Sequence, residues 1–129
     1  SGMRAFNLIV LWLGGLGFLA FGAAFLLSPL PTMLMSGIAL EGPLAATELM
    51  AFYGGLELAL GSLILACALQ PSRRRDGLWL MLVVYGGIGL SRLAGMLANG
   101  TDTSFLRIAL ALELGLALLA AIGLRGTRD

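Results

Sequence analysis

Histidine and lysine are absent from this chain of 129 residues, and there is one cysteine, Cys67. Without histidine the chain lacks the usual ligand of haem iron and of zinc, and the commonest general base. A single cysteine cannot form an intrachain disulfide bond. The net charge is only +1, which argues against a nucleic acid partner. With no Ser-His-Asp set, phosphate-binding loop or metal-binding motif, hydrolytic and nucleotide chemistry have no support, and we expect no catalytic residue, metal or cofactor.

Charge of either sign is also scarce. Charged residues make up 12% of the chain and hydrophobic residues 59%, with a mean hydropathy of +0.98. A soluble domain is about half apolar and about a quarter charged. A chain of this size cannot hide so much apolar surface from water, so lipid must be the solvent for most of it. Ser1-Gly2, before Met3, resemble the scar of a removed expression tag and are set aside.

Four apolar segments are each long enough to cross a bilayer as a helix, which takes about 20 residues. They cover residues 5–27, 43–69, 77–98 and 105–124. The apolar stretch of the first segment is too long for a cleaved signal peptide. We therefore predict an all-α integral membrane protein, a four-helix bundle formed by residues 3–129 as a single domain.

The basic residues indicate how the chain is oriented. All eight are arginine, and the connections 28–42 and 99–104 contain none of them. Six lie before, between or after the spans on the other side: Arg4, Arg73, Arg74, Arg75, Arg125 and Arg128. The positive-inside rule then places both termini and the 73–75 loop in the cytoplasm. We expect a multi-pass protein of the bacterial cytoplasmic (inner) membrane.

The two outer connections differ in character. Pro29 and Pro31 end the first span, and the apolar segment 32–40 is too short to cross the membrane. We expect it to lie on the outer surface as a short interfacial helix or a lid. The other connection is a polar turn, in which Thr103 or Ser104 can cap the last span.

Three ionisable residues lie inside apolar spans, where a charge is costly and needs a partner or a proton: Glu57, Arg92 and Glu113. Counted from the outer ends of the spans, their depths are about 16, 10 and 12 Å. Helical side chains lean toward the N-terminus of their own helix, so the two glutamates lean outward and the arginine leans inward. We therefore expect the three charges to meet at one level in the outer half of the membrane.

Two tyrosines complete the predicted ligand-binding site. Tyr53 lies one turn before Glu57, and either Tyr53 or Tyr85 can donate a hydrogen bond to a carboxylate. Arg92 can hold a carboxylate with both prongs of its guanidinium group. Asn99 lies on the same helical stripe as Tyr85 and Arg92 and is a secondary candidate.

Glu48 is the other secondary candidate, although its simpler interpretation is a favourable charge near a helix N-terminus. Two carboxylates face one arginine in the predicted cluster. Either one glutamate is protonated, or a cation or cationic ligand completes the set. The alternative is a buried ion pair that only locks the helices together.

Several short motifs together resemble a known family. They are Glu48…Tyr53-Gly54-Gly55-Leu56-Glu57, Gly89-Leu90-Ser91-Arg92-Leu93, Asn99-Gly100 and Glu113. The chain is similar in these to a bacterial four-span family, the domain of unknown function 4345, itself similar to DoxX-type membrane proteins. The resemblance implies a four-helix bundle in which the positions of Tyr53, Arg92 and Glu113 matter to the fold or the site. It brings no activity with it.

Three functions remain open. The first is a membrane protein that binds or transports a small polar or lipid-like molecule, with an anionic group held by Arg92 and a proton carried by a carboxylate. The second is a structural or assembly subunit whose ion cluster serves helix packing only. The third is a quinone- or lipid-modifying enzyme that uses Glu57 as acid and base. Membrane lipids are expected partners, and a homo-oligomer is compatible with a thin bundle of four spans.

Overall fold

The computed structural model describes residues 2–126, and every regular element in that range is helical. Four helical segments are long and apolar enough to cross a membrane, as the sequence predicts. These are Arg4–Leu27, Pro43–Leu69, Pro71–Asn99 and Ser104–Gly126. Ser1 of the predicted tag scar and Arg128 of the predicted basic C-terminus lie outside the described residues.

Helices α1 and α6 are single elements, whereas the second and third segments are composite. Their elements are α1 (Arg4–Leu27), α2 (Pro29–Met35), α3 (Pro43–Glu48), the π-helix η1 (Leu49–Gly55), α4 (Leu56–Leu69), the short 3₁₀-helix η2 (Pro71–Arg73), α5 (Arg74–Asn99) and α6 (Ser104–Gly126). The sequence predicted residues 43–69 as one continuous helix and gave no sign of the π-helix. At its end the amide of Leu56 donates to the carbonyl of Ala51, five residues earlier.

The connection after α1 is only partly as expected. Pro29 is the first residue of α2, which ends at Met35, so the helix begins before the predicted 32–40 segment and covers only its first residues. Proline is favoured at this first position because the missing amide hydrogen has no partner there in any case. The hydroxyl of Thr32 donates to the carbonyl of Ala24 at 3.1 Å and ties α2 to the end of α1.

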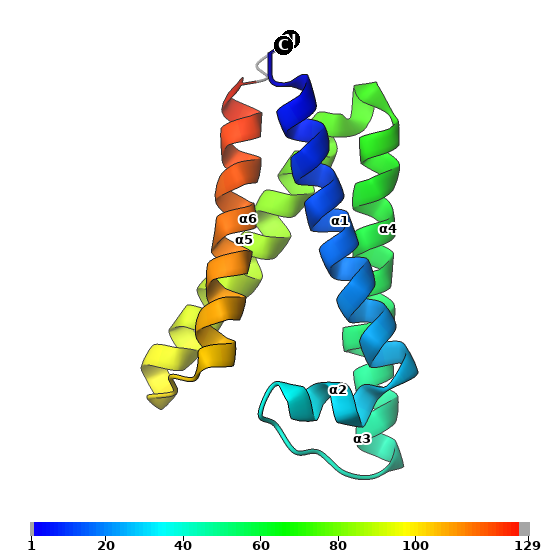
Figure 1. Ribbon diagram of the computed structural model, residues 1–129, viewed down its shortest axis with the longest axis vertical. Helices are drawn as coiled ribbons and strands as arrows, with labels where there is room; N and C mark the ends of the chain where they lie inside the picture. The colour runs from blue at the N-terminus through cyan, green and yellow to red at the C-terminus, as the bar shows by residue number, and fades with distance from the viewer. Residues whose placement is uncertain (1, 127–129) are drawn as a thin grey trace.

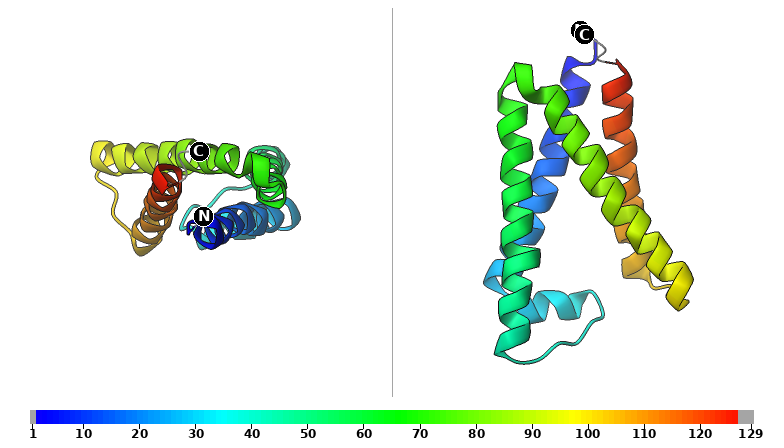
Figure 2. Two further views of the ribbon diagram at one scale, coloured as in Figure 1. Left: turned by 90° about the horizontal axis from the view of Figure 1, so that it is seen from above. Right: turned by 180° about the vertical axis from the view of Figure 1, so that it is seen from behind.

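The long helices form two pairs that meet at one end of the molecule and diverge toward the other (Figure 1). Helix α1 runs beside η1 and α4, and α5 runs beside α6. We call the end where α1 begins and α6 ends the closed end, and the opposite end, where α2 lies, the open end. The views from above and from behind show α5 leaving α4 at an angle (Figure 2).

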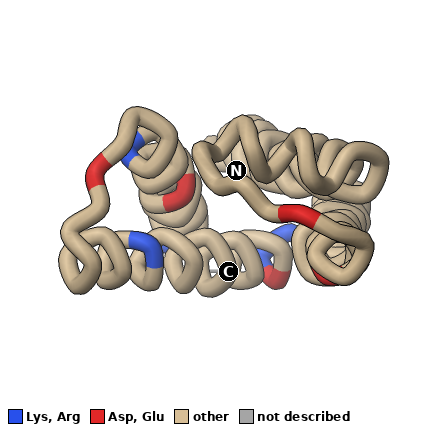
Figure 3. The backbone as a smooth tube through the Cα atoms, turned by 90° about the horizontal axis from the view of Figure 1, so that it is seen from below, with Lys and Arg blue, Asp and Glu red and all other residues tan. Residues whose placement is uncertain are grey.

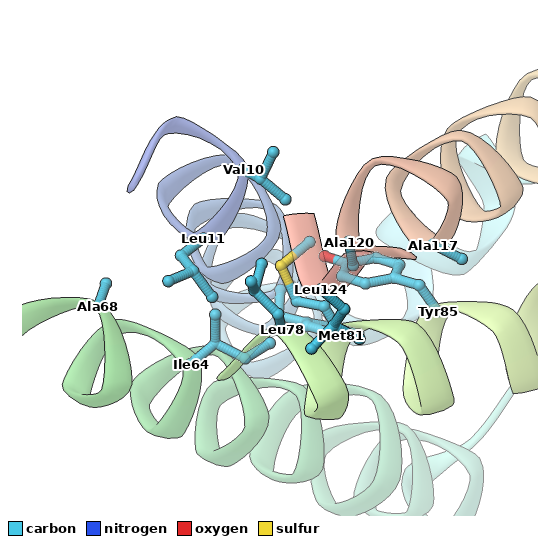
Figure 4. Close-up of a cluster of buried hydrophobic side chains, with 11 residues drawn as sticks. Val10, Leu11, Ile64, Ala68, Leu78, Met81, Tyr85, Ala117, Ala120 and Leu124 are labelled. Carbon is cyan, nitrogen blue, oxygen red and sulfur yellow. The ribbon is translucent and has the colours of Figure 1, made fainter. Parts of the chain in front are cut away.

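The main hydrophobic core joins the two pairs near the closed end (Figure 4). It contains Val10, Leu11, Phe18, Ile64, Ala68, Leu78, Met81, Tyr85, Ala117, Ala120 and Leu124. Farther toward the open end, no Cα atom of η1 lies within 8 Å of one in α5 or α6, and the same holds between α4 and α6. The four helical segments are therefore arranged as two helix pairs joined at one end, whereas the sequence predicted a four-helix bundle.

Glycines hold the first pair together. A Cβ atom on Gly61 would lie 2.7 Å from the carbonyl oxygen of Gly15, and one on Gly22 would lie 2.9 Å from that of Gly54. The backbones of α1 and of the η1–α4 segment therefore touch at two points one heptad apart. Such contacts are the usual basis of tight helix packing in lipid.

Arginines of the 73–75 loop close helix ends at the closed end. The Nε atom of Arg74 donates to the carbonyl of Ala68 at 2.9 Å, and Nη1 of Arg75 donates to that of Leu124 at 2.9 Å. The last carbonyls of a helix have no partner within it, so these bonds satisfy the ends of α4 and α6. Their positive charge also complements both helix dipoles.

Candidate functional site

Arg92 of α5 and Glu113 of α6 form a two-pronged ion pair. Nε of the arginine lies 2.8 Å from Oε1 of the glutamate, and Nη2 lies 2.7 Å from Oε2. The side chains are 26% and 13% exposed. The helices come close because Gly89 leaves room for α6, where a Cβ atom would lie 2.6 Å from Leu114. The predicted contact between these two charges is therefore present, with the geometry of a strong charge-assisted pair.

An aromatic ring that the sequence analysis did not single out covers the arginine. The guanidinium carbon of Arg92 lies 5.9 Å from the ring centroid of Phe105. Phe105 lies near the start of α6, about two turns before Glu113, and so on the same face of the helix. This spacing from Glu113 was the signal in the sequence that could have pointed to Phe105. The ring contributes a weak cation–π contact on one side of the ion pair.

Glu57 is near the ion pair but does not join it. The carboxylate is half-buried at the start of α4 and close enough for its charge to interact with those of Arg92 and Glu113. Within residues 2–126 it has no hydrogen-bond or ion-pair partner. The three-way contact predicted from depth is thus incomplete. The glycine contacts hold α4 against α1, and no Cα atom of α4 lies within 8 Å of one in α6, which carries Glu113.

Tyr85 uses its hydroxyl differently from the prediction. It donates to the carbonyl oxygen of Gly14 on α1 at 2.6 Å, and its ring stacks on Phe18 with centroids 4.3 Å apart. The expected bond to a carboxylate is absent from the described structure, although the side chain is close enough to interact electrostatically with both Glu57 and Glu113. Tyr85 therefore fastens α5 to α1 where the site meets the main hydrophobic core.

Tyr53 lies on the π-helix at the other side of the site. Its ring meets the edge of Phe25 at a centroid distance of 5.0 Å, and the residue is 46% exposed. It is close enough to Arg92 for an electrostatic interaction. Its hydroxyl has no hydrogen-bond partner in the part of the chain that the structure describes. π-Helical turns are frequent at functional sites because they displace side chains from the regular helical register.

The secondary candidates stand apart from this group. Glu48 ends α3 and Asn99 ends α5, and both are exposed. Neither makes a side-chain hydrogen bond or ion pair within the described range. The structure thus places Tyr53, Glu57, Tyr85, Arg92 and Glu113 around one region and leaves the other two at the ends of their helices. Charged positions are sparse along the four long helices (Figure 3).

A shallow, open hollow of about 480 Å³ lies on α5 beside the arginine. Its lining residues are Gly87, Ile88, Ser91 and Arg92. Ile88 and Ser91 lie about three and four turns beyond Gly77, on the same face of α5. At Gly77 this face packs against Cys67 of α4. The hollow therefore lies on the side of α5 that packs against Cys67 of α4 and Leu11 of α1 nearer the closed end.

One buried polar residue was missed by the sequence analysis. Asn7 of α1 is 4% exposed, and its Oδ1 atom has no conventional hydrogen-bond partner within the described chain. This oxygen lies against Gly123 of α6, where any Cβ atom would collide with it. A contact to the Cα hydrogen of a glycine is common where helices cross closely. The signal in the sequence was an asparagine one turn into an apolar span. Because Asn7 lies at the closed end, away from the site, we interpret it as a packing residue.

Four helices of this length and hydropathy, with ionisable side chains gathered between them, have the character of a multi-pass helical membrane protein. Within this class, the chain belongs to the family described as Domain of unknown function (DUF4345), which matches residues 6–124. No curated protein and no solved structure gives a match to the chain. The family description assigns no activity, so function must be argued from the site.

Proposed function

We propose that this is a multi-pass protein of the bacterial cytoplasmic membrane that binds a small amphiphilic molecule between its two helix pairs. Both termini and the 73–75 loop would lie in the cytoplasm, so the open end would face outward. One observation carries the proposal. Glu57, on the other helix pair, lies within electrostatic range of the Arg92–Glu113 ion pair and has no hydrogen-bond or ion-pair partner among residues 2–126.

A purely structural role for the cluster fits the geometry less well. The Arg92–Glu113 pair connects α5 with α6, which already form a hairpin through the short connection after α5. It does not tie the two helix pairs to each other. A charge left unpaired inside a membrane is costly. A cluster that served packing alone would place Glu57 against the cation, whereas a binding site must leave a group free for the ligand.

The hollow on α5 supplies the apolar part of the site. Gly87 and Ser91 are exposed, and Ile88 lies between them and the core. The lining ends at Arg92, so an apolar chain that lies along the hollow brings its polar head to the ionisable residues. Ligand pockets commonly combine an apolar lining with a few convergent polar groups in this way. Entry from the bilayer would proceed sideways, between α4 and α5.

The test fills the hollow without disturbing the fold. A Cβ atom on Gly87 has no heavy atom within 4 Å, and the same is true of Gly115 on α6. The protein and the variants Gly87→Leu and Gly115→Leu are purified in detergent and heated with dodecylammonium, dodecanol or dodecanoate. We expect at least one probe to raise the melting temperature of the unaltered protein and of Gly115→Leu, and the effect to disappear in Gly87→Leu. No stabilisation by any of the three probes, or equal stabilisation in both variants, would refute the proposal.

A further inference from the structure

The charges around the site do not balance. Arg92 carries one positive charge, while Glu57 and Glu113 can carry two negative charges. The only other arginine toward the open end, within the described chain, is Arg107, which pairs with Asp102 at 2.8 Å. The other arginines among residues 2–126 lie at the closed end. Arg4 begins α1, Arg125 lies in the last turn of α6, and the other three lie where α4 connects to α5: Arg73, Arg74 and Arg75. No further protein cation of residues 2–126 is therefore available to Glu57.

We infer that the ligand of this site carries a cationic headgroup, a primary ammonium on an apolar chain, which pairs with Glu57 while the chain lies in the hollow on α5. This inference depends on the proposed binding function and specifies its ligand class. An ammonium group has three donors and no acceptor, which suits a carboxylate that has no donor of its own. It would also bring the net charge of the site to zero.

The arrangement of the arginine disfavours an anionic headgroup. Nε and Nη2 of Arg92 are already bonded to Glu113, so the side of the guanidinium that holds a carboxylate best is occupied. A carboxylate or phosphate placed between Glu57 and the ion pair would be repelled by the negative charges of Glu57 and Glu113. The sequence-based expectation that Arg92 holds an anionic group is therefore replaced by one in which Arg92 neutralises Glu113.

Tyr53 adds a second feature that suits a cation. It lies on the π-helix one turn before Glu57, and its ring is packed on Phe25 along one side while nearly half of the residue is exposed. An exposed aromatic face beside a carboxylate attracts an ammonium group through the ring quadrupole. Its free hydroxyl can accept one further donor hydrogen. Glu57 on α4 and Tyr53 on η1 thus both lie within electrostatic range of Arg92, whose helix carries the hollow.

The experiment compares three headgroups on one chain length. Binding of dodecylammonium, dodecanol and dodecanoate is measured at pH 7 by calorimetry, with the protein in nanodiscs of zwitterionic lipid. Hydrogen bonds to charged groups contribute about 1.5–3 kcal/mol, so we expect the ammonium to bind at least about tenfold more tightly than the alcohol. Glu57→Gln should remove this preference, so that the ammonium and the alcohol bind with similar affinity. Glu48→Gln, on the same membrane segment but exposed and without a partner, is the control and should keep it.

The order of affinities in the unaltered protein decides the matter even if Glu57→Gln does not fold. Equal affinity for ammonium and alcohol would overturn the inference, since the balancing cation would then be a proton on a glutamate, and the binding function would still stand. Tightest binding of dodecanoate would overturn it in favour of an anionic ligand. Failure of all three probes to bind would instead refute the proposed function itself.

Discussion

The two ends of the molecule are built on different principles. At the closed end, four helices share one apolar core, arginines close two helix ends, and Asn7 is buried against a glycine. Toward the open end, the helix pairs separate, and Tyr53, Glu57 and the Arg92–Glu113 ion pair lie around the site. The closed end thus supplies stability that does not depend on the site. This division allows the open end to keep a carboxylate that contributes nothing to packing.

Breaking the ion pair should have the largest effect on stability. Arg92→Leu leaves Glu113 largely buried without its partner, and removal of one member of a buried pair typically costs 3–5 kcal/mol, so we expect a loss of about 3 kcal/mol. The double variant Arg92→Leu with Glu113→Leu should recover most of it. Arg107→Leu, which removes an exposed pair, should cost less than about 1 kcal/mol. Thermal unfolding in detergent measures all three, and a double variant no more stable than the single one would contradict this account.

Crowding the first helix pair should have the next largest effect. Gly61→Ala forces a Cβ atom to within 2.7 Å of the Gly15 carbonyl, where only a backbone shift can relieve the contact. Overpacking of this kind costs about 1–3 kcal/mol. Gly115→Ala meets no heavy atom within 4 Å and is the control. Similar melting temperatures for the two variants would mean that α1 and α4 are not held by backbone contact.

Removing one hydroxyl from the boundary between the two ends should have a smaller effect. Tyr85→Phe loses the bond to the Gly14 carbonyl but keeps the stacking on Phe18, so we expect a loss of about 1 kcal/mol. Tyr53→Phe removes a hydroxyl that has no partner in the described chain and should leave the melting temperature unchanged. If both variants behave alike, Tyr85 does not fasten α5 to α1.

The features that the sequence predicted depend on local chemistry. A run of about twenty apolar residues indicates a membrane span whichever helices the span packs against. The four predicted helical segments are present. Thr103 caps α6, with its hydroxyl 3.2 Å from the amide of Leu106, as turn chemistry predicts. The Arg92–Glu113 contact followed from depth and side-chain direction, because α5 and α6 are neighbours in a hairpin and have little freedom to lie elsewhere.

The features that the sequence did not predict depend on which helices touch. The partner of Tyr85 is a backbone carbonyl on α1, which no side-chain inventory can reveal. Glu57 stays away from the ion pair because two glycine contacts hold η1 and α4 on α1. The π-helix that carries Tyr53 changes the register before Glu57, and the apolar sequence of this segment does not signal it. In each case a contact between helices determined the position of the side chain, and the membrane depth counted along a single helix did not.

Neutralising the free carboxylate should have the smallest effect and the opposite sign. Glu57→Gln removes a charge that has no partner among residues 2–126, so in the absence of ligand we expect the protein to become more stable by up to about 1 kcal/mol. Glu48→Gln, at an exposed position, should change little. Sites that bind ligands are commonly less stable than the fold would allow, because groups reserved for the ligand are unsatisfied without it. Destabilisation by Glu57→Gln in ligand-free protein would mean that the carboxylate already has a structural partner, and the open end would then be part of the packing.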